Sequence, residues 1–192
     1  MTSALYLPAA ERVSRPWKNG GGLTADLAIE PAGAGLDDFD WRISIARVEA
    51  AGPFSAFPGV ERVMAILSGE GLSLTVGAAP PVALTPASEP HRFPADRPTD
   101  CALLGGPVTD LNVMVRRGRA EAALTRIALE PGVAETFESG PAVLLWVEGE
   151  GALEVADLSL RPAPLDAVRC DGPARWRLRA DGPVLAWLAA VS

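Results

Sequence analysis

A glycine motif that occurs twice constrains the fold of this chain more than any other feature. Gly69-Glu70-Gly71 follows one apolar run, and Gly149-Glu150-Gly151 follows another, 80 residues further on. Downstream, Gly106-Pro107 is repeated by Gly182-Pro183 at an offset of 76. Because several short matches occur in the same order at nearly the same offset, the sequence predicts two related units fused in one chain.

Both units are predicted to consist of short strands. Apolar and polar residues alternate with a period of two at 23–29, 41–46 and 72–76, which is typical of strands. The 19 glycines and 18 prolines favour many turns. The order strand, Gly-Glu-Gly turn, strand, loop and Gly-Pro turn is typical of a small jelly roll, and the unit length fits its cupin form. We therefore expect an all-β bicupin with two fused jelly-roll (RmlC-like) β-barrels. Residues 1–117 would form the first unit with an N-terminal leader, and residues 118–192 the second.

The charge balance limits the classes of partner. The chain has 17 basic and 24 acidic residues, a net charge of −7. This argues against nucleic acid, which needs a basic footprint, and against an anionic membrane surface. We see no secretory signal and no apolar run near the roughly 20 residues of a membrane span. The two cysteines, Cys101 and Cys170, are interpreted as reduced thiols, so a cytoplasmic location is expected.

A metal centre of the usual cupin kind is not expected. Such centres use two or three histidines with a carboxylate, and this chain has a single histidine, His91. Neither cysteine has a second ligand at close spacing. We therefore predict no metal and no cofactor.

The polar candidates for a binding site lie in the first unit. Trp17, Lys18 and Asn19 precede three glycines that lead into a strand, which excludes a phosphate loop because such loops lead into a helix. We expect this stretch to close the mouth of a pocket. The remaining candidates are side chains predicted to line that pocket, namely Arg42, Ser44, His91 and Asn112.

These side chains and backbone N–H groups would suit a small carboxylate in an apolar barrel. The alternatives are structural: Arg42 on a solvated strand face, Asn112 as a buried amide that satisfies a turn, and His91 as a core side chain. In the second unit the apolar run 143–146 dominates, and residues 167–169 replace His91-Arg92-Phe93. We interpret that unit as structural support without a pocket.

Four motifs in order resemble the HutD/Ves family. They are Trp17–Gly22, Asp40–Ala46, Gly52–Ser55 with Phe57–Gly59, and Asp110–Met114 with Arg117-Gly118. The resemblance covers residues 5–118 well and the remainder by length and pattern. It implies a bicupin that is linked to histidine utilisation and binds a small molecule without acting as a pathway catalyst. Urocanate and N-formylglutamate, which contain carboxylates, would be the natural ligands.

Three functions remain open at this point. The first is a metal-independent binding protein that senses a small anionic metabolite. The second is a metal-independent enzyme acting on a small organic acid with His91 as general acid or base, for which Asp110 or Glu61 could supply the second titratable group. The third is a scaffold with a vestigial pocket. Unpaired sheet faces could pack a homodimer, although no stretch of sequence indicates one.

Overall fold

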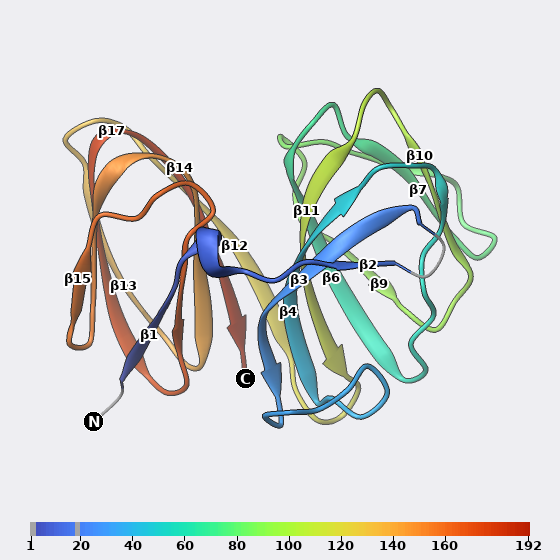
Figure 1. Cartoon of the computed structure of the whole chain (residues 1–192), viewed down its shortest axis with the longest axis horizontal. Helices are drawn as coiled ribbons and strands as arrows, with labels where there is room; N and C mark the ends of the chain where they lie inside the picture. Colours follow the sequence, from blue (N-terminus) through green and yellow to red (C-terminus); the bar gives the residue numbers. More distant parts are fainter. Residues whose placement is uncertain (1–2, 18–19) are drawn as a thin grey trace. The chain divides into compact units, whose positions relative to one another are not determined.

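The computed structural model describes residues 3–17 and 20–192 and divides the chain into two compact units. The continuous unit is Val13–Ala122, and the discontinuous unit combines Met1–Arg12 with Ala123–Ser192 (Figure 1). The predicted division at residue 117 kept the N-terminal leader with the first unit. The structure differs, because strand β1 (Ala4–Leu7) forms an antiparallel ladder with β16 (Ala167–Cys170).

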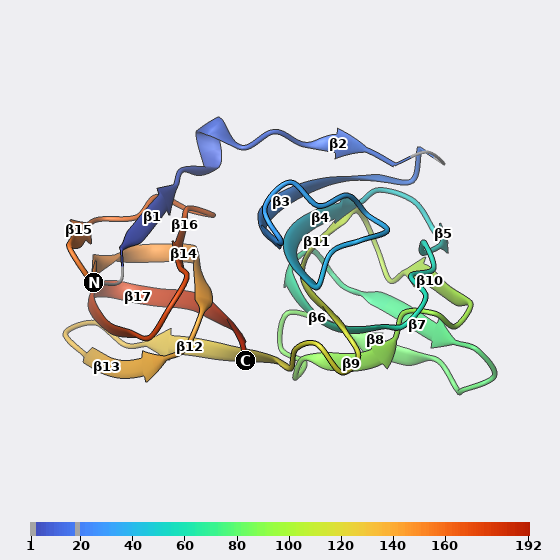
Figure 2. The same ribbon diagram turned by 90° about the horizontal axis from the view of Figure 1, so that it is seen from below.

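The continuous unit consists of two antiparallel sheets, which enclose one core (Figure 2). The six-stranded sheet has the order β2 (Arg15–Pro16), β3 (Gly22–Glu30), β4 (Trp41–Val48), β11 (Val108–Arg116), β6 (Val60–Ser68) and β9 (His91–Pro94). The four-stranded sheet has the order β5 (Gly52–Pro53), β10 (Thr99–Leu103), β7 (Leu72–Val76) and β8 (Val82–Leu84). Met64 and Ile66 from the first sheet pack with Leu72, Leu74 and Cys101 from the second.

The discontinuous unit has one seven-stranded sheet. Its main order is β1, β16, β14 (Ala142–Val155), β17 (Ala174–Val191) and β12 (Ala122–Leu129). In addition, β13 (Ala134–Ser139) pairs with β17, and β15 (Leu158–Leu160) pairs with β14. The core of this unit is apolar and includes the fully buried rings of Trp146 and Trp176.

The N-terminal segment is fixed to the discontinuous unit by Asp166. The Tyr6 hydroxyl donates to Asp166 Oδ2 at 2.5 Å, and the Ala9 N–H, in the 3-10 turn η1 (Ala9–Glu11), donates to Asp166 Oδ1 at 2.7 Å. The Ala163 N–H also donates to Asp166 Oδ2, at 2.8 Å. Three donors thus satisfy this buried carboxylate and hold residues 4–12 beside β16.

The strand pairing supports the internal repeat. Residues 80 apart in β6 and β14 face residues 76 apart in β11 and β17. The corresponding pairs are Met64 with Asn112 and Ile66 with Asp110 in the continuous unit, and Leu144 with Leu188 and Trp146 with Ala186 in the discontinuous unit. A register shift follows the second pair in both units. The two copies therefore share a pairing scheme as well as short sequence matches.

The prediction of an all-β fold is confirmed, but two finer expectations are not. Within the described residues, the strand orders run from edge to edge, so the hydrogen bonding does not close either unit into a barrel. Gly69-Glu70-Gly71 does connect β6 to β7, whereas Gly149-Glu150-Gly151 lies inside β14. The reason is that β17 pairs with both halves of β14 and absorbs the glycines as a register shift. No helical segment among the described residues has the length and hydropathy of a membrane span.

Candidate functional site

One face of the six-stranded sheet gathers most of the buried polar side chains of the continuous unit. Residues that pair across antiparallel strands lie on the same face. One row across the sheet runs Asp26, Ser44, Asn112, Met64 and His91. The neighbouring rows on this face add two arginines and an aspartate. We define the polar face as Asp26, Arg42, Ser44, Arg62, Asp110 and Asn112.

Arg62 lies at the centre of this arrangement. Its side chain is buried, and its Nε donates to Asn112 Oδ1 at 2.7 Å. The guanidinium lies 4.7 Å above the ring of Phe54 and 5.7 Å from that of Phe93. Burial lowers the pKa of Arg62 to about 10. Among the described residues, no hydrogen bond is made by the terminal nitrogens of this guanidinium, so its two-pronged end is free to bind an acid.

Asn112 connects Arg62 to a buried carboxyl group. Its Nδ2 donates to Asp110 Oδ1, while Asp110 Oδ2 has no hydrogen-bond partner among the described residues. Burial raises the pKa of Asp110 to about 6, although the positive charge of Arg62 opposes this rise. The result is a chain of three side chains with unused donors at one end and an unused acceptor at the other.

Arg42 is already paired. Its Nε donates to Asp26 Oδ1 at 2.6 Å, and its Nη2 lies 2.6 Å from the same oxygen. Ser44 is buried beside Asn112 in the same row. The structure therefore brings Arg42, Ser44 and Asn112 together on one face, as the sequence predicts, but most of the charge of Arg42 is used within the protein.

The remaining predicted residues lie around this face. Trp17 Nε1 donates to Thr24 Oγ1 at 2.7 Å, and its ring meets Phe54 edge-on at 5.9 Å. His91 is half-buried at the edge strand β9 and stacks on Phe93 at 5.9 Å. Lys18 and Asn19 lie outside the described residues. Trp17 and Phe54 therefore form an aromatic cover above Arg62.

Sequence reasoning missed Arg62. The run 62–68 was interpreted as a buried apolar strand, whereas Arg62, Met64 and Ile66 all project onto the same face. The available signal was a single arginine in phase with those two apolar residues. Asp110 was noticed only as a neighbour of Asn112 and as one candidate partner for His91, and the pairing of Asp26 with Arg42 joins different strands and has no local signature.

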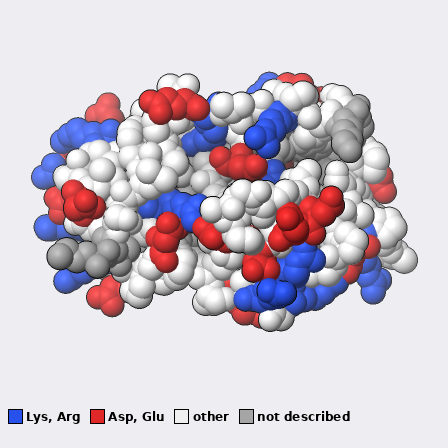
Figure 3. All heavy atoms as spheres, turned by 60° about the horizontal axis from the view of Figure 1, so that its bottom comes forward, with Lys and Arg blue, Asp and Glu red and all other residues white. Residues whose placement is uncertain are grey.

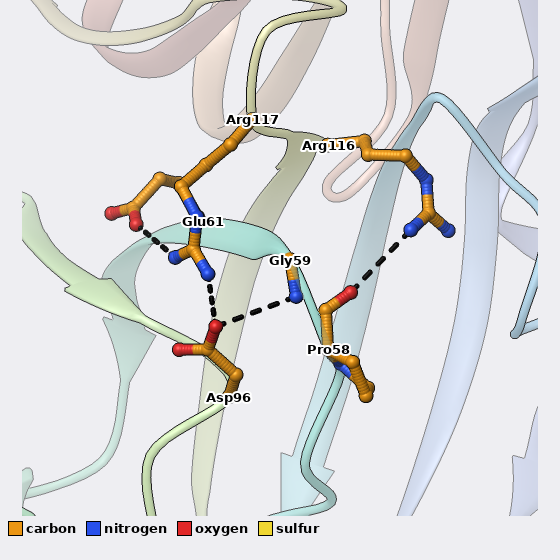
Figure 4. A network of polar contacts seen from close by, with 6 residues as sticks. All are labelled: Pro58, Gly59, Glu61, Asp96, Arg116 and Arg117. Carbon is orange, nitrogen blue, oxygen red and sulfur yellow. Dashed lines mark hydrogen bonds and ion pairs between the residues drawn. The ribbon is translucent and has the colours of Figure 1, made fainter.

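A second polar network lies at one end of the continuous unit (Figure 4). Arg117 donates to Glu61 Oε1 at 2.7 Å and also to Asp96, whose Oδ2 accepts the Gly59 N–H. The hydrogen bond from Arg117 lowers the pKa of Asp96. Arg116 donates to the backbone carbonyl of Pro58 at 3.4 Å. These groups satisfy one another at the surface, so we interpret the network as structural.

A broad open groove of about 1090 Å³ lies in the discontinuous unit. Its charged side chains include Arg177 and Glu154, whose Nη1 and Oε2 atoms are 3.7 Å apart. Acidic and basic side chains are interspersed over the molecular face seen in Figure 3. The groove offers paired surface charges, whereas the polar face offers buried groups with unused hydrogen-bonding capacity. The polar face is therefore the stronger candidate site.

Solved structures show what the fold is similar to. A conserved protein of unknown function from Pseudomonas aeruginosa PAO1 is 29% identical, with a TM-score of 0.88 over 99% of both chains. HutD from Pseudomonas fluorescens SBW25 is 28% identical, with a TM-score of 0.81 over 99% of this chain and 98% of its own. The oxalate decarboxylase of Bacillus subtilis, a cupin-fold protein at 8% identity and a TM-score of 0.69, shows the likeness of fold alone.

Sequence comparisons agree with the structural ones. An uncharacterized 21.2 kDa protein from the hutC 3′ region of Pseudomonas putida is 36% identical over 146 residues, which are 76% of this chain and 74% of that protein. Protein Ves of Citrobacter koseri is 34% identical over 134 residues, 69% of this chain and 67% of its own. The family model described as HutD matches residues 9–188. The chain thus belongs to the HutD family.

Proposed function

We propose that this chain is a metal-independent binding protein that holds a small organic acid on the polar face of the continuous unit. The observation that supports this most directly is Arg62, whose guanidinium is buried and fixed through Nε but keeps its terminal N–H groups unused. A guanidinium presents these groups as a planar fork that matches a carboxylate. The aromatic rings of Phe54 and Phe93 hold the fork in place.

The class of acid is suggested by relatives. One curated relative is named for its position in the hutC 3′ region, and one structural relative is named HutD. Together with the family's link to histidine utilisation, these names favour urocanate or N-formylglutamate. A protein that binds such an acid reversibly would report the level of the metabolite and modulate the pathway.

Binding is favoured over catalysis by the position of His91. Acid–base catalysis needs a proton donor or acceptor within hydrogen-bond reach of the substrate, and usually a second titratable group. Met64 lies between His91 and Asn112 in the register row. Within the described part of the chain, His91 makes no hydrogen bond to Asp110, and Glu61 is engaged by Arg117 instead. His91 therefore has no partner that would activate it.

Isothermal titration calorimetry with urocanate and N-formylglutamate tests the proposal. Hydrogen bonds to charged groups contribute about 1.5–3 kcal/mol, so we expect Arg62→Ala to weaken binding by roughly 10- to 150-fold. Arg177→Ala, which removes an exposed arginine of the other unit, is the matched control and should bind as the wild type does. Absence of binding at millimolar concentration, or unchanged affinity in a folded Arg62→Ala protein, would overturn the proposal.

A further inference from the structure

The chain Arg62–Asn112–Asp110 ends in two different ways. At Arg62 the unused groups are N–H donors, and at Asp110 the unused atom is the acceptor Oδ2. Only one amide, that of Asn112, separates these ends. A ligand that pairs with Arg62 alone would leave the carboxyl oxygen buried and unsatisfied.

We infer that Asp110 determines specificity, and that the ligand is an acid that also presents an N–H donor to Asp110 Oδ2. This inference rests on the proposed function. It adds to that function a second recognition point and a chemical requirement on the ligand. Simple carboxylates satisfy only the Arg62 end of the site.

The burial of Asp110 excludes bulk water as the partner of its Oδ2. Asp110 is completely buried, and its row neighbours on either side, Ile66 and Ala46, are apolar. The charged or titratable groups that influence this region are Arg62 from β6, Arg42 from β4 and Cys101 from β10. Among them, Arg62 already donates to Asn112 and Arg42 to Asp26. A donor for Oδ2 must therefore come from an enclosed molecule.

The repeat supplies an independent argument. Ala186 occupies the position of Asp110 in the discontinuous unit, and it pairs with Trp146 as Asp110 pairs with Ile66. The same strand scheme thus forms without any carboxyl group at this position. Because the fold does not need Asp110, and burial of an unsatisfied carboxyl group is costly, a role in ligand recognition accounts for its presence.

The protonation state of Asp110 is compatible with an acceptor role. Burial raises the pKa of Asp110 to about 6, so at pH 8 the group is ionised and can only accept hydrogen bonds. Entry to the site requires displacement of the cover formed by Trp17 and Phe54, because Phe54 lies directly over Arg62. Binding should consequently change the fluorescence of Trp17.

Two planar acids of nearly equal size test the inference by calorimetry at pH 8. Urocanate has an imidazole N–H, whereas 3-(2-furyl)acrylate has a ring oxygen and no donor. We expect the wild type to prefer urocanate by about 10- to 100-fold, because the furan leaves a buried acceptor unpaired. In Asp110→Asn this preference should disappear, since the amide presents N–H groups where the carboxylate accepted one. Asp100→Asn, an exposed aspartate of the same unit, is the charge-matched control.

The outcomes separate the two proposals. If neither acid binds the wild type, the proposed function fails. If both acids bind equally well and Arg62→Ala weakens both, the proposed function stands and the role of Asp110 is overturned. Retention of the preference in folded Asp110→Asn also overturns it. The ligand comparison on the wild type decides the question even if Asp110→Asn does not fold, and a Trp17→Phe protein identifies the fluorescence change.

Discussion

The two units share a pairing scheme and differ in what their strands present to the interior. Three positions of the continuous unit contain polar side chains where the discontinuous unit has apolar ones. The pairs are Arg62 with Ala142, Asp110 with Ala186 and Asn112 with Leu188. The scheme of bulges and registers is therefore independent of the polarity of the inner face. This comparison teaches that the polar face is an addition to the framework, and that its cost in stability has to be offset by something other than folding.

The largest effect is expected from making Asn112 apolar. Asn112→Leu copies the residue of the other unit but leaves Arg62 Nε and Asp110 Oδ1 buried without partners. We expect the free energy of unfolding to fall by about 3–5 kcal/mol, because removal of one member of a buried polar network exposes the others to the full desolvation cost. Guanidinium chloride denaturation measures this change.

A triple variant provides the control for this change. Arg62→Ala, Asp110→Ala and Asn112→Leu together reproduce the inner face of the discontinuous unit, and they remove the stranded charges as well as their partner. We expect the triple variant to be more stable than Asn112→Leu alone, while ligand binding is lost. A triple variant that is less stable than the single variant would show that the polar chain supports the fold, and would break the comparison.

The next effect concerns the pH dependence contributed by Asp110. Its pKa in the folded protein, about 6, lies above the ordinary 3.8, so the folded state binds a proton before the unfolded state does. Its contribution to stability is therefore greatest below pH 3.8 and is lost as the pH rises to about 6. The loss amounts to about 3 kcal/mol for a shift of about two units. Asp110→Asn should flatten the unfolding free energy between pH 4 and 6, measured by urea denaturation.

Asp166 gives the opposite sign and serves as the control. Burial alone would raise the pKa of Asp166, but hydrogen bonds from Tyr6, Ala9 and Ala163 lower it below 3.8. Its stabilising contribution is present above pH 3.8 and is lost as the pH falls below that value. Asp166→Asn should therefore leave the slope between pH 4 and 6 unchanged. An equal change of slope in both variants would contradict the assignment to Asp110.

The smallest effect is expected in the groove of the discontinuous unit. Arg177 and Glu154 are both exposed, and pairs of this kind contribute less than about 1 kcal/mol. We expect Arg177→Ala to leave both stability and affinity for the acids close to wild-type values, by denaturation and calorimetry. A marked loss of affinity in this variant would assign the ligand to the groove and not to the polar face.

Much of the architecture follows from local patterns in the sequence. The period-two runs predict most of the strands, and the Gly-Glu-Gly repeat predicts the duplication, because both depend on neighbouring residues. Arg42, Ser44 and Asn112 are predicted on one face for the same reason. The close approach of Gly149 to the Pro183 carbonyl, 2.1 Å from a Cβ built at this position, explains why its glycine persists even where no turn follows.

What could not be predicted depends on long-range pairing. Arg62 joins the site because β6 pairs with β11, about 50 residues away, and its neighbours in sequence suggest only a core strand. The leader joins the discontinuous unit because Tyr6 meets Asp166, a contact between opposite ends of the chain. Neither relationship leaves a periodic signal in a single sequence.

The position of β1 has a consequence for the order in which the molecule is made. Residues 4–12 leave the ribosome before the continuous unit, but their partners, β16 and Asp166, are synthesised more than 150 residues later. The continuous unit, Val13–Ala122, is complete long before then and can fold as a unit during synthesis. Throughout that interval β1 is an unpaired strand. Maturation of the protein therefore ends with the capture of its earliest strand by one of its last.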